Sequence, residues 1–169
     1  MRASTGAALG ALALATTPGT VSLTDTIPAD NGVNHDGTPA NALVYRITGV
    51  SGTFSSGATQ FALLVDSKTG VGNGIQAQIS YDTNGDGTFD RVETYRYFAT
   101  DPVVGFESYG QNTGLVGSSG SLANMTNGTI ELKIWNAIGS NPSYLEVGAK
   151  TSLNQQSILV LPFTNTTTQ

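Results

Sequence analysis

The sequence predicts an all-β fold, an antiparallel β-sandwich of the jelly-roll kind. Short segments in which apolar and polar residues alternate recur along the chain, and clusters of Gly, Ser, Asn and Pro separate them. Gly, Thr, Ser and Asn together supply 71 of the 169 residues, a composition that favours turns and short strands over long helices. A chain of this length is sufficient for one domain with a hydrophobic core.

Each predicted strand follows from its own pattern, in which every second side chain is apolar because one face of the strand is buried. A first strand is expected soon after residue 21, and only residues 103–110 suggest a helical turn. Seven or eight strands without a convincing helix favour a sandwich. The later predicted strands are residues 43–48, 61–65, 75–81, 91–99, 129–137, 144–149 and 156–163.

The chain divides into an N-terminal segment, residues 1–20, one sandwich domain, residues 21–164, and a short tail, residues 165–169. The N-terminal segment has three interpretations. It is a secretory signal, because Arg2 precedes an apolar run, or a linker, or a strand donated to a neighbouring molecule. The Thr-rich tail is expected to fray.

Charge and composition exclude several classes of partner. Seven Lys and Arg against twelve Asp and Glu give a formal net charge of −5, so the chain lacks the basic surface that nucleic acid requires, and an anionic membrane repels it. The longest apolar run is about nine residues, half of what a membrane-spanning helix needs. The absence of cysteine excludes a disulfide framework, a thiolate metal site and a cysteine nucleophile.

The strongest local motif is the acidic stretch YDTNGDGTFDRVE, between the predicted strands 75–81 and 91–99. Its oxygen-bearing residues match the spacing D-x-[DN]-x-[DN]-G-x5-E of a calcium-binding loop. A hard cation needs six to eight oxygens at about 2.4 Å, and alternate side chains of a tightly curled loop supply them. Gly87 permits the bend. The predicted Ca²⁺ ligands are Asp82, Asn84, Asp86, Thr88, Asp90 and Glu93.

A second interpretation of this stretch stays open, because helices flank calcium loops of the EF-hand type and strands flank this one. The stretch also fits a long hairpin turn, in which Asn84–Gly85 and Asp86–Gly87 supply left-handed backbone and the carboxylates are solvated. Without a cation, however, four negative charges crowd into twelve residues. We therefore expect Ca²⁺ to hold the hairpin in a structural role.

Five aromatic residues are candidate contacts for a sugar ligand. Trp135, the only tryptophan, lies on the polar face of the segment 129–137, where an exposed indole offers a stacking surface to a pyranose ring. Tyr95 and Tyr97 share one face of the segment 91–99, and either face of that segment is a candidate for burial. Tyr109 and Tyr144 lie in loop contexts at the rim of the predicted surface. Packing is the alternative role for each of the five.

From about Gly74 to Phe163 the chain resembles the β-sandwich carbohydrate-binding modules attached to secreted microbial glucanases, above all those that degrade β-1,3-glucan. The stretches YDTNGDGTFDR, YRYF and the later IWNA carry this resemblance. It implies an extracellular, non-catalytic module that binds a β-glucan polysaccharide beside a covalently linked catalytic domain. Phe106 stands where those modules carry a tryptophan, so the smaller ring changes that contact.

No catalytic constellation stands out in the sequence. The single histidine, His35, lies in the turn sequence NHDGTP, and the chain has no nucleophile elbow, phosphate loop or dinucleotide motif. Glycoside hydrolysis needs two carboxyl groups about 5–9.5 Å apart, and Glu93 and Glu131 are a candidate pair as cross-strand neighbours. A small glycoside hydrolase is therefore a less favoured alternative to the binding module.

A further alternative is a structural subunit of an extracellular filament or surface layer. Low charge and abundant Thr, Gly, Asn and Ser support this class, and residues 1–20 would then be the strand donated to the next copy. The property that distinguishes it from a binding module is self-assembly that requires residues 1–20.

Overall fold

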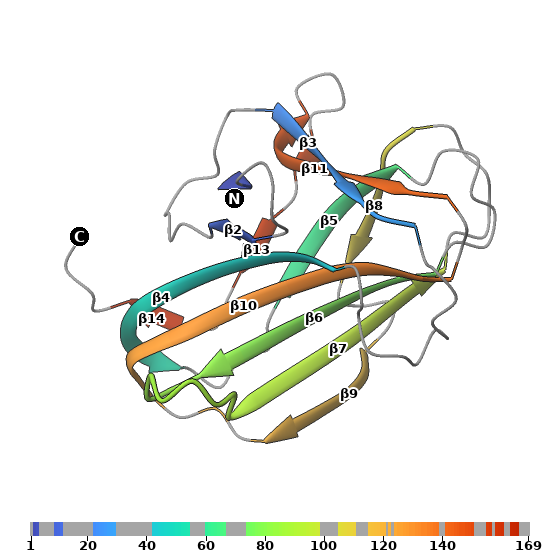
Figure 1. Cartoon of the computed structure of the whole chain (residues 1–169). Coiled ribbons are helices and arrows are strands. Elements are labelled where there is room, and N and C mark those ends of the chain that lie inside the picture. Colours follow the sequence, from blue (N-terminus) through green and yellow to red (C-terminus); the bar gives the residue numbers. More distant parts are fainter. Residues whose placement is uncertain are drawn as a thin grey trace.

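A computed structural model describes residues 2–3, 9–11, 22–29, 42–54, 60–66, 74–98, 105–110, 115–120, 122, 124–138, 141–150, 155–156, 158–160 and 163–165. All regular elements in these ranges are β-strands, and they form two sheets packed face to face (Figure 1). This arrangement confirms the predicted all-β sandwich. Over the same ranges, no helix has the length and hydropathy needed to cross a membrane.

The larger sheet has four long antiparallel strands at its centre and shorter strands at its edges. Its central order is β4 (Leu43–Phe54), β10 (Met125–Ile138), β6 (Gly74–Asp82) and β7 (Arg91–Phe98), with β9 (Leu115–Gly120) beyond β7. The other edge of β4 pairs with β2 (Leu9–Ala11) in parallel and with β14 (Phe163–Asn165), and β1 (Arg2–Ala3) pairs with β2.

The smaller sheet lies against the inner face of the larger one (Figure 1). Its central order is β3 (Ser22–Ile27), β11 (Ser143–Lys150), β5 (Gln60–Asp66) and β8 (Glu107–Gly110). β5 and β11 pair directly at two positions. Further along, β12 (Gln155–Gln156) pairs with β11 and β13 (Ile158–Val160) pairs with β5.

The order in which the chain visits the two sheets has the jelly-roll pattern. β3 belongs to the smaller sheet, β4 to the larger, β5 to the smaller, β6 and β7 to the larger, and β8 to the smaller. β10 then returns to the larger sheet and β11 to the smaller. The result is two four-stranded antiparallel sheets, β4-β10-β6-β7 and β3-β11-β5-β8, which matches the predicted fold class.

Strands β8 and β9 differ from the sequence prediction. The helical turn expected in residues 103–110 is wrong, because Glu107–Gly110 form strand β8 against β5. Strand β9 was not predicted, because its sequence LVGSSG lacks alternation. Both strands are short, and pairing with a long neighbouring strand stabilises them where their own sequences give little signal.

Apolar side chains from both sheets fill the space between them. Ile130, Leu132 and Ile134 of β10 are fully buried there, as are Ile79 of β6 and Leu145 of β11. Since these residues occupy alternate positions of their strands, their neighbours in sequence lie on the opposite faces of the sheets.

Two sets of polar contacts between described residues join the two sheets. The Tyr45 hydroxyl of β4 donates to the Asp25 carboxylate of β3 at 2.5 Å. At the end of β10, the Asn136 amide donates to the backbone carbonyl of Pro28 at 2.9 Å, and its oxygen accepts from the Ser143 hydroxyl at 2.9 Å. Side-chain hydrogen bonds between buried groups fix how the sheets are placed relative to each other.

The Tyr45 hydroxyl makes the stability of the fold sensitive to alkaline pH. Burial, and then the contact with Asp25, raise the pKa of Tyr45 above its ordinary value of 10.0. Above about pH 10 the unfolded chain therefore loses a proton that the folded chain keeps. We predict that Tyr45 lowers the free energy of unfolding by up to about 1.4 kcal/mol per pH unit above that pH.

Urea denaturation at several pH values between about 8 and 11 measures this slope in the wild type and in Tyr45→Phe. The variant is less stable at neutral pH, because it leaves Asp25 without its hydroxyl donor, and its stability falls less steeply above pH 10. Equal slopes in the two proteins would contradict the assignment.

Candidate functional site

Strand β10 carries the candidate site on the side opposite the core. It is paired along both edges, so that Glu131 lies between Arg46 of β4 and Ser80 of β6. Lys133 lies in the same way between Val44 and Gln78. We call this surface the outward face of the larger sheet. It is formed by Val44, Arg46, Gln76, Gln78, Ser80, Thr94, Glu131, Lys133 and Trp135.

An ion cluster occupies the middle of the outward face. The Glu131 carboxylate is fully buried, and its Oε2 atom accepts from Arg46 Nε at 2.8 Å and from the second guanidinium nitrogen. Its Oε1 atom lies 3.1 Å from Lys133 Nζ. A buried carboxylate requires such partners, and the two cations keep part of their side chains in solvent, 42% for Arg46 and 30% for Lys133.

Next to this cluster, Gln78 and Thr94 form a cross-strand pair. The Gln78 side-chain amide donates to the Thr94 hydroxyl at 3.2 Å, and both residues are half-buried. The outward face thus presents guanidinium, ammonium, amide and hydroxyl groups close together on a sheet. The two cations only donate hydrogen bonds, whereas the amide and the hydroxyl both donate and accept them.

Trp135 lies on this face as the sequence predicts, but the expectation that its ring is exposed is wrong. Only 4% of the residue is exposed, because Ala42 and Val44 pack against it. In the described part of the chain its indole N–H has no hydrogen-bond partner. The indole ring therefore does not offer an exposed surface on which a sugar ring could stack.

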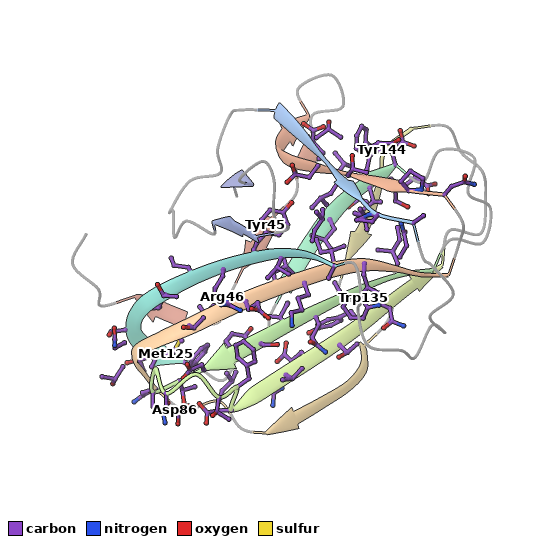
Figure 2. All side chains as sticks on the ribbon, in the orientation of Figure 1. Tyr45, Arg46, Asp86, Met125, Trp135 and Tyr144 are labelled. Carbon is purple, nitrogen blue, oxygen red and sulfur yellow. The ribbon has the colours of Figure 1, made fainter. Side chains whose placement is uncertain are left out.

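Of the predicted tyrosines, Tyr95 and Tyr144 have described side chains, and neither lies on the outward face with Trp135. Tyr95 is buried in the core, which decides the face left open by the sequence and removes Tyr95 from the candidate sugar contacts, and its hydroxyl donates to Glu93 at 2.8 Å. Burial, and then this contact, raise the pKa of Tyr95 above its ordinary value. Figure 2 shows Tyr144 on the smaller sheet, opposite the one that carries Trp135. The side chains of Tyr97 and Tyr109 lie outside the described residues.

The sequence did not single out Arg46, Gln78 or Thr94. For Arg46 and Gln78 the alternating pattern places the residue on the side of the sheet away from the core, whereas for Thr94 the pattern left the buried face open. What brings these residues beside Glu131 is the pairing of β10 with strands remote in sequence. That pairing is visible in the fold and not in any single segment.

The acidic loop is held in shape by its own backbone N–H groups. Asp82 is buried, and its carboxylate accepts from the backbone N–H groups of Asn84 at 3.3 Å, Gly85 at 2.7 Å and Gly87 at 2.9 Å. Gly85 and Gly87 have φ angles of 75° and 87°, the left-handed backbone expected for a tight bend. Both features agree with the predicted hairpin turn.

Asp86 lies at the exposed tip of this loop (Figure 2). It accepts from the Thr88 backbone N–H at 2.8 Å and from the Asn84 side-chain amide at 3.0 Å. These two donors hold the pKa of the Asp86 carboxyl below its ordinary value. The charge of Asp86 is therefore retained to lower pH than that of an unpartnered aspartate.

The last two predicted Ca²⁺ ligands have other partners. Asp90 accepts from the backbone N–H and the hydroxyl of Thr83 at 2.7 Å and 2.5 Å. Glu93 is directed to the inner face of β7, where it accepts from Arg91 Nε and the Tyr95 hydroxyl, both at 2.8 Å. Over the residues that the structure describes, no group of three or more His, Cys, Asp and Glu is placed to hold a metal. Ca²⁺ binding therefore stays a prediction.

The acidic loop also packs tightly on the beginning of β10. The Thr126 backbone N–H donates to the Thr83 carbonyl at 2.8 Å. A Cβ atom on Gly85 would collide with the Asn127 carbonyl, and one on Gly128 would collide with the Asp82 carbonyl. Glycine at these two positions thus permits backbone segments to touch, and the loop is anchored to the strand that carries the outward face.

The carboxylate pair suggested for glycoside hydrolysis does not form. Glu131 lies on the outward face, whereas Glu93 lies on the inner face among core residues, so the sheet separates them. His35 lies outside the described residues. A scan against models of protein families and a search of curated proteins found no match for the chain.

Calcium binding is tested by thermal unfolding with calcium and with chelator. Because Asp82, Asn84 and Asp86 carry oxygens on the loop, we predict that saturating Ca²⁺ raises Tm by about 5 °C. Glu93 is directed to the inner face of the sheet, so we do not expect it to contribute to this rise. Asp86→Asn removes most of this rise. Glu93→Gln lowers Tm but keeps the rise. An identical Tm in calcium and in chelator would contradict the prediction.

Proposed function

We propose that this protein is a non-catalytic carbohydrate-binding module and that it binds a β-glucan chain on the outward face of the larger sheet. The observation that supports the proposal most is the ion cluster of Arg46, Glu131 and Lys133. It fixes two partly exposed cationic donors, held by one buried carboxylate, on a sheet face that also carries the Gln78 amide and the Thr94 hydroxyl. Such a surface is suited to a ligand that is rich in hydroxyl groups.

The charges of this cluster support a neutral ligand. Glu131 is shared between Arg46 and Lys133, so the three groups together keep a net charge of +1. Sugar hydroxyls both donate and accept, and they bond well to ionised groups that are already held in place. A cationic polymer would meet the two partly exposed cations, and the net charge of −5 on the chain repels an anionic polymer.

The shape of the site determines the strength expected for binding. A ligand that lies on a sheet face buries little of each sugar ring, so we expect modest affinity for each ligand chain. Modest affinity suits a module that holds a linked catalytic domain near a polysaccharide, where several weak contacts act together. An extracellular location and a covalently linked glucanase domain are part of this proposal.

The proposal is tested by isothermal titration with laminarin, a soluble β-1,3-glucan. We predict that Lys133→Ala and Gln78→Ala each weaken binding about tenfold, because each removes a hydrogen-bonding group from the outward face. Tyr144→Ala is the matched control, since this half-buried tyrosine lies on the other sheet and its loss leaves the affinity unchanged.

Unchanged affinity in both outward-face variants, with the native Tm retained, would overturn this location of the site. A loss confined to Tyr144→Ala would place the ligand on the smaller sheet. Absence of any heat of binding in the wild-type protein would remove the β-glucan proposal itself.

A second candidate function, a self-assembling structural subunit, is favoured by the edge of β4. Strand β2 pairs with β4 in parallel over three positions, in a sheet whose other pairs are antiparallel over the described residues. The same short strand can pair with β4 of a neighbouring copy through identical contacts. The chain would then assemble through residues 1–20.

Size-exclusion chromatography at several concentrations separates the two functions. As a binding module, the protein elutes as a monomer whether or not residues 1–20 are present, and this is the result we predict. Larger species that grow with concentration and vanish when residues 1–20 are removed would instead identify a structural subunit.

A further inference from the structure

We propose that the bound glucan chain crosses the strands of the larger sheet over one row of residues and does not follow a single strand. We call this row the cross-strand row. The inference rests on the proposed function and deepens it, because it gives the ligand a direction and a minimum length and gives Thr94 a role in recognition. The row consists of Val44, Lys133, Gln78 and Thr94, which lie side by side on β4, β10, β6 and β7.

Burial distinguishes the cross-strand row from its neighbours. All four of its residues are half-buried, so each keeps part of its surface in contact with solvent. On β10, in contrast, the outward residues on both sides of Lys133 are buried, because Glu131 is 0% and Trp135 is 4% exposed. A ligand that followed β10 would therefore find an accessible side chain at only one of these three positions.

The neighbouring strand β6 shows the same pattern. Gln76 and Ser80 are the outward residues before and after Gln78, and both are buried. On the two central strands, the cross-strand row is thus an accessible line between two buried ones. A ligand that crosses β10 and β6 along this line contacts Lys133 and then Gln78.

The polar groups of the row alternate between donating and accepting, as a series of sugar hydroxyls requires. Lys133 Nζ is paired with the buried Glu131 and has further N–H groups for a ligand. The Gln78 side-chain amide donates to the Thr94 hydroxyl at 3.2 Å. Its carbonyl oxygen can therefore accept from a ligand, and the Thr94 O–H can donate to one. From β10 to β7 the row offers a donor, an acceptor and a donor.

The width of the sheet determines the shortest ligand that fills the row. Neighbouring strands lie about 4.8 Å apart, so the row from β4 to β7 spans roughly 14 Å. A single sugar ring covers part of this distance, whereas a short linear oligosaccharide covers all of it. We therefore expect affinity to rise with the length of the glucan until the chain extends from Val44 to Thr94.

A matched pair of variants tests the direction of the ligand. Thr94→Val removes the hydroxyl at the β7 end of the row. Thr48→Val makes the same change on the same face of the sheet, at an exposed residue four positions along β4 from Val44 and outside the row. Valine keeps the shape of threonine and is favourable in strands, so we expect both variants to retain the native Tm.

Isothermal titration with a β-1,3-linked glucose hexamer measures the effect of each change. We expect Thr94→Val to bind the hexamer about fivefold more weakly than the wild type, because one hydrogen bond to the ligand is lost. We expect Thr48→Val to bind it with unchanged affinity. In the wild type, the β-1,3-linked glucose dimer is expected to bind more weakly than the hexamer, because it is too short to span the row.

The outcomes separate this inference from the proposed function. If the hexamer binds the wild type and Thr94→Val equally well, the ligand does not cross to β7, so this inference is wrong and the binding function stands. A loss of affinity in Thr48→Val alone would show that the ligand runs along the strands. Equal affinity for the dimer and the hexamer would also overturn the inference. If the hexamer does not bind the wild type, both proposals are overturned.

Discussion

The double pairing of β10 is the constraint on which the rest of the structure depends. Because β4 and β6 pair with its two edges, successive side chains of β10 have only two directions available, into the sandwich or away from it. Ile130, Leu132 and Ile134 point inward and form the centre of the core. Glu131 therefore points outward. A shift of the strand by one residue would exchange the two sets, placing a carboxylate in the core, so the burial of the isoleucines also fixes the candidate site.

The candidate site is rigid because the sheet beneath it is tied to its surroundings. The acidic loop packs on the beginning of β10, and Asn136 joins the end of β10 to the chain at Pro28 and to Ser143 of the other sheet. Arg46 and Glu131 thus belong to strands that have little freedom to move apart. For a ligand that gains little from burial, binding groups held in place beforehand reduce the entropy lost on binding. The contacts that stabilise the fold therefore also hold the polar groups of the candidate site in place.

The sequence predicted the fold class and most strands, because period-two alternation marks a strand that has one buried face. It did not predict β8 and β9, which are short and depend on pairing with longer neighbours. Alternation also assigned Trp135 to the side opposite Ile134, yet it contains no information about what covers that side. For residues 91–98, alternation left open which face is buried, and the structure places Tyr95 inside. Both gaps have one cause, since burial is decided by contacts between segments remote in sequence.

The central claim, that the outward face of the larger sheet is the binding surface, is tested most directly by mapping backbone amide shifts while a β-1,3-glucan oligosaccharide is added. The account predicts that the shifts cluster on the strands that carry Arg46, Gln78, Thr94 and Lys133, with little change in β3, β5 and β11. Shifts that cluster on the smaller sheet around Tyr144 would contradict it.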